Sequence, residues 1–518
     1  MRARLSSFAA AALALAAVPA AGQAPGAQAP NAVTTTAAAG DTASHTTDVR
    51  ARPPRLGPPA ALRLPPAAER RLANGLRLVV VEQHELPLAD FALVVHAGSE
   101  ADPAGREGLA TMTAALLDEG TATRTALQIA DQASYLGVSL GAGAGWDASR
   151  VVLHTPVAQL DSALALMADV VTRPGFPVRD VERLRRERLT GLLQLRDEAP
   201  AVADRAFAQQ LFGAGHPYGR PAGGTEASTR ALTRADVQRF YAAHWRPNNA
   251  TLVVVGDVRA DDVARRVERA FAAWQPAAVP APVAPAAPAA RATAVYLVDK
   301  PDAPQSSVRI GLAGVARTTP DYFPLQVLNT VLGGSFTSRL NQNLREVKGY
   351  SYGAGSGFGM RRAAGPFIAQ AEVTGEKTDS ALVEFMRELG AIADTVPVAE
   401  LERAKQYLVL QLPGAFETTD DIAGQLVPLV TYGLPLDFYD TYQARVQAVT
   451  QADVQRVARR YLDPSRLVVV VVGDRKRVEA GVRGINLGPV TAARVEDVLG
   501  AGAPRPAGGT GGRGRAGL

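Results

Sequence analysis

Residues 232–257 read LTRADVQRFYAAHWRPNNATLVVVGD, and residues 449–474, which lie 217 positions later, read VTQADVQRVARRYLDPSRLVVVVVGD. The two stretches align without a gap and are identical at 12 of 26 positions. This spacing is far longer than the roughly 20 to 50 residues of a solenoid repeat. The chain therefore contains one domain twice, and we expect each copy to have its own core.

Each copy of the repeat predicts a helix that is followed by a buried strand. Thr233 and Thr450 occupy positions suited to a helix N-cap, and the amphipathic stretches after them end before Pro247 and Pro464. The aliphatic runs that come next end in Gly-Asp and are typical of a strand covered on both faces. These runs are residues 252–255 and 467–472.

The N-terminal residues predict export. Arg2 and Arg4 precede an apolar stretch, residues 8–18, which leads to small residues near position 22. This pattern is typical of a secretory signal peptide, and about 11 apolar residues are too few for a membrane span of roughly 20. We therefore expect a periplasmic or extracellular protein with no membrane span.

Composition narrows the possible chemistry. The chain contains no cysteine, so a disulfide, a thiolate nucleophile and a cysteine-ligated zinc are excluded. The formal net charge is +5, from 55 Lys and Arg against 50 Asp and Glu. Part of this excess lies in the C-terminal tail, so the sequence does not indicate a nucleic-acid partner.

Segments rich in Pro, Ala and Gly divide the chain. Residues 275–292 form a Pro-Ala tract, which we expect to be extended and to let the two halves face each other as a clam. The predicted organisation is a signal peptide (1–22), a disordered segment (23–66), an N-terminal domain (67–274), the linker (275–292), a C-terminal domain (293–485) and a disordered tail (501–518). The predicted fold class is α+β, with two homologous domains that each pack helices on a mixed β-sheet.

Three separated motifs carry a family resemblance. They read LANGLRLVVVEQHELPLADFALVVHAGSEADPAGREGLATMTAALLDEGT from residue 72, HPYGRPAGGTEAS from residue 216 and LGGSFTSRLNQNLREVKGYSYG from residue 332. Their order, together with the duplication, resembles the pitrilysin or insulinase-like family of zinc peptidases over roughly residues 68–480. The similarity is greatest to the bacterial and mitochondrial-processing-peptidase branch of that family.

The resemblance implies a degenerate zinc site. Family members with a zinc site carry H-x-x-E-H on the first helix, here predicted over residues 106–118, because two histidines at i and i+4 share a metal and the glutamate acts on its water. The corresponding residues are Thr111, Ala114 and Ala115. The resemblance therefore implies no zinc in this chain.

A later helix, predicted over residues 181–197, matches the family helix that supplies a further carboxylate ligand. Glu187 matches the first of two glutamates, and Gln194 falls on the ligand position. The alternative for Glu187 is an exposed pair with Arg183 at i, i+4 spacing, which we favour. The histidines at 45, 84, 96, 154, 216 and 244 include no pair at i, i+4, and we interpret His216 and His244 as structural.

The C-terminal copy retains the other part of the family site. The resemblance assigns substrate contacts to an arginine and a tyrosine seven residues apart, which are Arg345 and Tyr352 here. We place Arg345 on a helix over residues 337–347 and Tyr352 on a strand over residues 350–358. A guanidinium can hold a peptide carbonyl, and a phenol can donate to an oxyanion. The alternative is that Arg345 pairs with an acid and Tyr352 is an ordinary strand residue.

These features favour a non-catalytic, substrate-binding subunit that completes the active site of a zinc-bearing homologue, so that the pair cleaves peptides or unfolded segments. Peptide capture by strand addition at a sheet edge would suit this role. The sequence also allows two alternative functions. One is a structural or holdase-like homologue without a proteolytic role, and the other is an active metallopeptidase with an unrecognised metal site.

Overall fold

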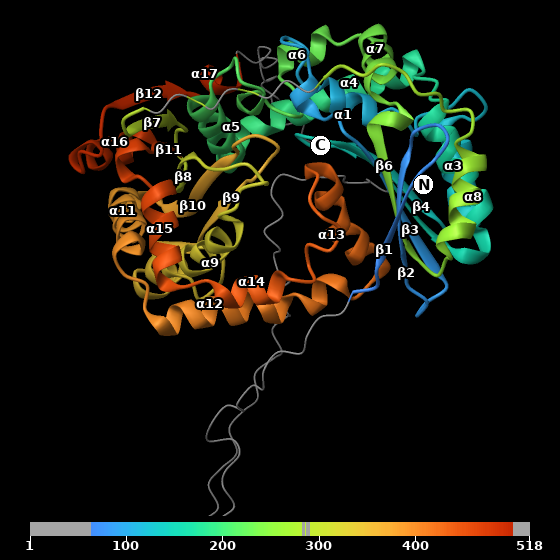
Figure 1. Ribbon diagram of the computed structural model, residues 1–518. Coiled ribbons are helices and arrows are strands. Elements are labelled where there is room, and N and C mark those ends of the chain that lie inside the picture. Colours follow the sequence, from blue (N-terminus) through green and yellow to red (C-terminus); the bar gives the residue numbers. More distant parts are fainter. Residues whose placement is uncertain (1–63, 282–284, 286–287, 289–290, 501–518) are drawn as a thin grey trace, which may run out of the picture. The chain divides into compact units, whose positions relative to one another are not determined.

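The computed structural model describes residues 64–281, 285, 288 and 291–500 (Figure 1). The predicted signal peptide, nearly all of segment 23–66, parts of the linker 275–292 and the tail 501–518 lie outside the described residues. The described chain contains two six-stranded mixed sheets, each packed with helices. The prediction of two homologous α+β domains is confirmed.

The first sheet has the strand order β1-β2-β6-β3-β5-β4. Only β2 and β6 run parallel, and the other neighbouring pairs are antiparallel. β4 therefore lies at an edge of this sheet. The strands are β1 (Ala67–Arg71), β2 (Arg77–Glu82), β3 (Leu88–Val95), β4 (Ser139–Ala144), β5 (Ser149–Pro156) and β6 (Ala250–Gly256).

The second sheet repeats this order as β12-β7-β11-β8-β10-β9, so β9 corresponds to β4. The copies differ at the opposite edge, where β1 pairs antiparallel with β2 but β12 pairs parallel with β7. The strands are β7 (Ala294–Asp299), β8 (Gln305–Ala313), β9 (Ser351–Phe358), β10 (Pro366–Thr374), β11 (Val468–Gly473) and β12 (Val490–Arg494).

The repeated stretch folds as predicted. α7 (Arg234–His244) and α15 (Gln451–Tyr461) each begin at a capping box, in which the hydroxyl of Thr233 or Thr450 accepts a hydrogen bond from the backbone N–H of Asp236 or Asp453. Both helices end before the prolines. The strands that follow, β6 and β11, are buried along almost their whole length.

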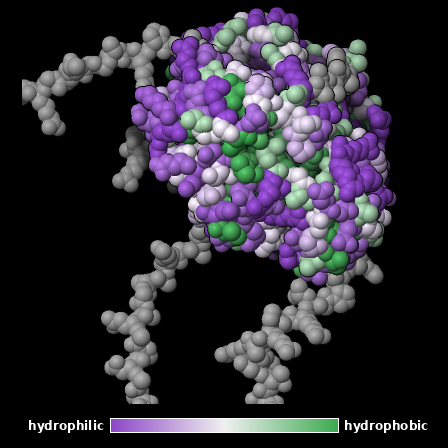
Figure 2. Space-filling view, turned by 90° about the vertical axis from the view of Figure 1, so that its left-hand side faces the viewer, coloured by the Kyte–Doolittle hydropathy of each residue, from purple (hydrophilic) through white to green (hydrophobic). Residues whose placement is uncertain are grey.

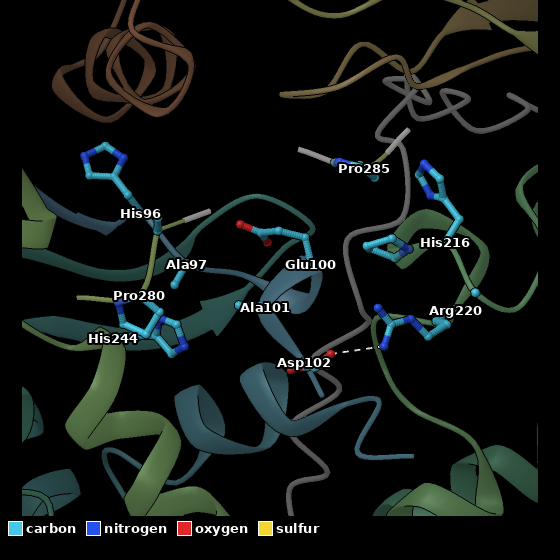
Figure 3. A pocket seen from close by; sticks show the side chains of 13 residues that line it. His96, Ala97, Glu100, Ala101, Asp102, His216, Arg220, His244, Pro280 and Pro285 are labelled. Atoms are coloured by element: carbon cyan, nitrogen blue, oxygen red, sulfur yellow. Dashed lines mark hydrogen bonds between the residues drawn. The ribbon is translucent and has the colours of Figure 1, made fainter. Parts of the chain in front are cut away.

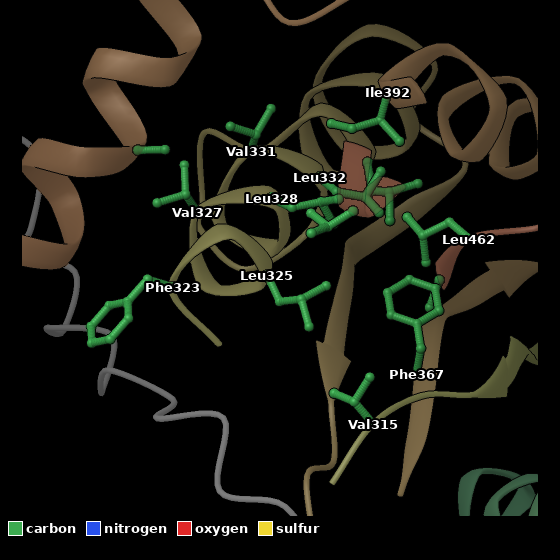
Figure 4. Packing of buried hydrophobic residues seen from close by; sticks show 14 of the residues in the cluster. Val315, Phe323, Leu325, Val327, Leu328, Val331, Leu332, Phe367, Ile392 and Leu462 are labelled. Carbon is green, nitrogen blue, oxygen red and sulfur yellow. The ribbon is translucent and has the colours of Figure 1, made fainter. Parts of the chain in front are cut away.

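Each sheet buries one face against helices of its own copy. The first sheet packs against α1 (Leu109–Ala115), α2 (Ala126–Leu136), α3 (Leu160–Thr172), α7 and α8 (Ala260–Ala270). In the second copy, the aliphatic side chains of α9 (Tyr322–Leu332) meet Phe367 of β10, Ile392 of α11 (Thr378–Asp394) and Leu462 after α15 (Figure 4). The further helices of this copy are α12 (Val398–Gln411), α14 (Tyr442–Ala448), α16 (Arg475–Gly484) and α17 (Val495–Leu499).

The other face of each sheet is covered by a helix from the opposite copy. α5 (Ala199–Phe212) belongs to the N-terminal copy but places Val202 and Phe207 against Val470 and Val472 of β11. α13 (Thr419–Tyr432) packs in turn on β3 and β6, where the Thr419 hydroxyl donates to the Asp90 carboxylate at 2.5 Å. The expectation that each copy has its own core therefore holds for one face of each sheet only.

Two predicted helices differ from the structure. The helix predicted over 106–118 begins only at Leu109, because Gly108 has a φ of 87°, outside the right-handed helical region, and it ends at Ala115. The helix predicted over 337–347 is a short α10 (Arg339–Asn341) that continues as a π-helical turn, η6 (Gln342–Val347). Both changes lie beside the predicted site residues.

Hydrophilic residues cover most of the face shown in Figure 2, which is the left-hand side of Figure 1. Apolar residues on this face form a narrow strip and small separate areas. Among the described residues, none of the helices combines the length and the hydrophobicity that crossing a bilayer would require.

Candidate functional site

The three positions of the zinc motif lie on α1. The Thr111 hydroxyl is 3.0 Å from the carbonyl oxygen of Gly108 and 3.1 Å from that of Ala222, so its proton is used inside the chain. Ala114 is fully buried and Ala115 is half-buried. These methyl groups and a hydroxyl that donates to carbonyl oxygens provide no imidazole or carboxylate, so the residues present do not fit a zinc ion.

A partly buried arginine faces the same helix. Arg188 of α4 (Val178–Gln194) donates from Nη1 to the Gly108 carbonyl oxygen at 2.7 Å, and this oxygen also accepts from Thr111. Burial lowers the pKa of Arg188 to about 10, which leaves the guanidinium charged at neutral pH, while the Asp102 carboxylate acts in the opposite direction. A permanent cation thus lies beside the degenerate motif.

The sequence did not indicate Arg188, because one arginine among several on a polar helix carries no sign of burial. Gln194, which we placed at the ligand position, is exposed. Glu187 is also exposed and accepts hydrogen bonds from Arg183 at 3.0 and 3.2 Å. The interpretation of Glu187 as a surface pair with Arg183 is confirmed.

A cavity of about 670 Å³ is lined by residues of the N-terminal copy and by Pro280, Ala281 and Pro285 of the linker (Figure 3). Burial lowers the pKa of His96 to about 4 and also lowers the pKa of His244, so both imidazoles are neutral at pH 7. His216, which we interpreted as structural with His244, lines the same cavity and packs against Phe212 at 4.9 Å between ring centres. The sequence did not predict that these three histidines line one cavity.

The two carboxylates that line this cavity accept hydrogen bonds from other groups of the protein. Asp102 accepts the backbone N–H groups of Gly108 and Ala110 at 2.8 Å each and so caps α1. Glu100 accepts from the Gly98 N–H at 3.0 Å and from Arg362 at 3.1 Å. Across residues 64–281, 285, 288 and 291–500, no group of three or more His, Cys, Asp or Glu side chains is arranged to hold a metal ion.

Arg345 and Tyr352 lie next to each other in the C-terminal copy. The guanidinium carbon of Arg345, on η6, lies 5.0 Å from the ring centre of Tyr352 on β9 and 4.7 Å from that of Phe336. Tyr352 is 85% exposed and Phe336 is 60% exposed. Arg345 Nε is 3.4 Å from the Glu346 carboxylate, so the predicted acid partner is also present. The result is a partly exposed cation between two aromatic rings, and the sequence did not indicate the ring of Phe336.

The two glycine-rich edge strands correspond to each other but differ in what covers them. β4 with its turn reads SLGAGAGW, and β9 reads SYGAGSGF. In an antiparallel pair only alternate residues bond to the neighbouring strand. On β9 the outward N–H groups of Ala354 and Ser356 donate to Asn341 Oδ1 at 3.2 Å and to the Gly333 carbonyl oxygen at 3.0 Å. This edge is closed by the chain itself.

The edge of β4 is open. Gly145 N–H donates to the Ala148 carbonyl oxygen, and this fixes which residues of β4 bond to β5. Leu140, Ala142 and Ala144 then direct their N–H groups away from β5, and these groups form no hydrogen bond within the described part of the chain. A Cβ atom at Gly143 would meet nothing within 4 Å. A glycine in a strand where no neighbouring atom excludes a side chain is typical of a site that another backbone approaches closely.

Two family models match the chain. Residues 77–218 match Insulinase (Peptidase family M16), and residues 231–408 match the Peptidase M16 inactive domain. A curated relative, a zinc protease of Mycobacterium leprae, is 30% identical over 341 residues, which cover 65% of this chain and 76% of the relative. A non-peptidase homolog of Helicobacter pylori, YmxG, is 23% identical over 405 residues, which cover 77% of this chain and 92% of that protein.

The solved structures include a peptidase M16 inactive domain from Pseudomonas fluorescens. Its TM-score is 0.74 at 28% sequence identity, and the match covers 79% of this chain and 98% of that one. A protease of Helicobacter pylori has a TM-score of 0.73 at 22% identity and covers 79% of this chain and 100% of its own, which shows a shared fold.

Proposed function

The chain belongs to the insulinase family, peptidase family M16, and we propose that it is a non-catalytic, substrate-binding subunit that works with a zinc-bearing homologue. The observation that carries this proposal is a contrast within the N-terminal copy. The motif positions on α1 hold Thr111, Ala114 and Ala115, while the adjacent sheet keeps an open edge at β4.

The inactive character is supported by the relatives and by the residues. The chain resembles proteins named inactive domain and non-peptidase homolog, and its α1 has no metal ligand. The guanidinium of Arg188 lies where it would repel a divalent cation brought to α1. The protein is therefore a peptidase-like protein whose own site is inactive.

The open edge of β4 supports peptide binding by strand addition. Three outward N–H groups, on Leu140, Ala142 and Ala144, with the carbonyl groups of the same residues, can pair with an extended peptide. Glycines at positions 141 and 143 leave the strand free of large side chains on one face. Main-chain pairing of this kind favours extended segments over a defined side-chain sequence, so the substrate class is unfolded peptide.

The partner would supply the metal, and this chain would supply Arg345 and Tyr352. Both side chains project from one exposed cluster with Phe336, so they are accessible to a second molecule. A charged guanidinium can hold a peptide carbonyl of the bound substrate, and the phenol can donate to the oxyanion that forms during hydrolysis. We place the pair outside the cytoplasm because residues 1–22 have the pattern of a signal peptide.

The decisive experiment blocks the open edge. Ala142→Pro removes one outward N–H group without removing a hydrogen bond to β5, and Ala142→Ser is the matched control that retains the N–H. We expect the wild type and Ala142→Ser to bind a fluorescein-labelled Val- and Thr-rich peptide, and Ala142→Pro to bind it about tenfold more weakly, as expected for the loss of one backbone hydrogen bond in a water-excluded contact. Equal binding by all three proteins would refute peptide capture at β4.

The pairing is tested separately. Mixing the chain with an H-x-x-E-H-bearing homologue of the same organism should give a heterodimer on gel filtration, with an interface of roughly 2,000 Å² or more. Peptide cleavage should require both chains. A zinc-bearing homologue that is fully active alone, and whose activity this chain does not change, would contradict the proposed role.

A further inference from the structure

In the turn between β4 and β5, three backbone carbonyl groups accept hydrogen bonds from two different parts of the chain. In this turn, residues 145–148, the Gly145 and Trp146 carbonyl oxygens accept the N–H groups of Ser99 and Glu100 at 3.0 Å each. The next carbonyl oxygen, that of Asp147, accepts from Arg362 Nη2 at 2.7 Å. The N-terminal copy thus holds two of the three carbonyl groups, and the C-terminal copy holds the third.

Arg362 belongs to the corresponding turn of the other copy, residues 359–365 between β9 and β10. Its backbone N–H donates to Asp147 Oδ2 at 2.9 Å, and its Nη1 donates to Glu100 at 3.1 Å. The neighbouring Ala363 N–H donates to the Tyr218 hydroxyl at 3.2 Å, and this hydroxyl donates to Asp147 Oδ1 at 2.7 Å. Both carboxylate oxygens of Asp147 are thereby fixed.

The guanidinium of Arg361, whose Nη1 atom is buried, completes the contact. The guanidinium carbon of Arg361 lies 4.1 Å from the ring centre of Trp146 and 4.5 Å from that of Tyr218. Trp146 and Tyr218 meet edge to face at 5.8 Å between ring centres. Cation–π contacts are strongest where water is excluded, as it is at Tyr218, which is 1% exposed.

β4 needs such support because its sequence does not favour a rigid strand. Gly141 and Gly143 alternate with small residues, and glycine loses more conformational freedom on ordering than any other residue. β4 also has a neighbour on one side only. The hydrogen bonds to the turn at residues 145–148 fix the position of one end of this strand.

We propose that the turn 359–365 acts as a clamp, with Arg362 as a positioning residue that orders the open edge of β4 for peptide binding. The inference rests on the proposed function, because it assigns to the C-terminal copy the ordering of a binding edge in the N-terminal copy. Without the clamp, β4 would open from its turn, and a peptide would have to order the strand before pairing with it. The apparent affinity equals the intrinsic affinity multiplied by the fraction of molecules in which the edge is already formed, so it falls as that fraction falls.

The experiment compares Arg362→Ala with Arg477→Ala in the full chain. Arg477 forms an ion pair with Glu376 at 3.0 Å and serves as the matched control, because it lies in the C-terminal copy and away from the turn. Hydrogen exchange reports on β4 through the N–H groups of Gly141 and Gly143, which bond to β5, and of Gly145, which bonds to the Ala148 carbonyl oxygen within the turn. Asp147→Asn, which keeps the side-chain shape, is the milder second variant in case Arg362→Ala does not fold.

We expect Arg362→Ala and Asp147→Asn to exchange these amides at least about tenfold faster than the wild type. They should bind the fluorescein-labelled Val- and Thr-rich peptide about tenfold more weakly, with Arg477→Ala unchanged in both measurements. Unchanged exchange in both variants would overturn the clamp, whether or not the peptide binds. Faster exchange with wild-type affinity would overturn its role in binding. A wild type that does not bind the peptide would instead refute the proposed function.

Discussion

Arg361 and Trp146 stack against each other across the two copies of the repeat, with 4.1 Å between the guanidinium carbon and the centre of the indole ring. Arg361 Nη1 is buried and has no hydrogen-bond partner in the described residues. Burial lowers the pKa of this arginine to about 10. The ring faces of Trp146 and Tyr218, together with the nearby Asp147 carboxylate, therefore offset the cost of removing this charge from water.

The coupling between these two residues is measurable by a double-mutant cycle. Arg361→Leu and Trp146→Leu should each destabilise the fold, and the double variant should be less destabilised than the sum, with a coupling of about 1–2 kcal/mol for a desolvated cation–π pair. Urea unfolding monitored by circular dichroism gives the three free energies. Strict additivity would show that the stacking contributes no specific interaction.

The Glu100 carboxyl makes stability depend on pH. Burial raises the pKa of Glu100 to about 7, above its ordinary value of 4.5, despite the neighbouring Arg362. The native state therefore binds an extra proton between these two values, and stability falls as pH rises through that window. In the wild type, the free energy of unfolding should fall by an amount on the order of 2–3 kcal/mol between pH 4.5 and pH 7 because of Glu100. Glu100→Gln should abolish this fall.

The measurement for Glu100 is urea unfolding of the wild type and Glu100→Gln at several pH values. Burial also raises the pKa of Asp102 to about 7, so the free energy of unfolding of both proteins should still decrease somewhat with rising pH. Parallel pH profiles would mean that Glu100 titrates in the native state as it does in the unfolded chain.

Restoring the motif should not restore the metal site. The variant Thr111→His, Ala114→Glu, Ala115→His places the missing groups on α1, but Arg188 keeps a permanent charge beside them. We expect no stoichiometric zinc by elemental analysis, in the wild type or in this variant, and tighter zinc binding when Arg188→Ala is added. About one tightly held zinc per wild-type chain, with chelator-sensitive proteolysis, would contradict this expectation.

Arg345 and Tyr352 should affect catalysis of the mixed complex without affecting its assembly. Arg345→Ala or Tyr352→Phe should lower kcat/KM about tenfold to a thousandfold if a transition-state hydrogen bond is lost. Phe336→Leu should have a smaller effect of the same kind, because it removes one of the two rings that orient the guanidinium. Gel filtration of each mixture separates a lost contact from a lost complex, and unchanged rates would assign these residues a structural role.

The sequence predicted those features that depend on neighbours along the chain. Thr233 and Thr450 were identified as caps because the bond joins residues three apart, and β6 and β11 were identified because a β-branched run needs cover on both faces. The sequence did not predict β4, because SLGAGA has no β-branched residue and forms a strand only through its pairing with β5. Tertiary contacts decide such segments.

The site was predictable only where the family motif aligned residue by residue. The family signature assigns a role to Arg345 and Tyr352, which lie next to each other in the structure. It does not indicate Phe336, because the ring of Phe336 reaches Arg345 only after the chain turns at Gly333 and Gly334. One cavity is lined by His96, His216 and His244, which come from three segments far apart in the sequence, so no local pattern could predict it. Arg188 was missed for the same reason.

The placement of α5 and α13 bears on how a duplicated protein of this kind could begin. A chain with a single copy would leave one face of its sheet bare, and it could cover that face only by lending its helix to a second molecule and borrowing one in return. Such an ancestor would fold only as a symmetric pair, at a rate set by its concentration. Joining the copies turns that encounter into an intramolecular step, and it also frees each copy to change without altering the other. The two copies do differ in this way, because the edge of β4 is open and the edge of β9 is closed.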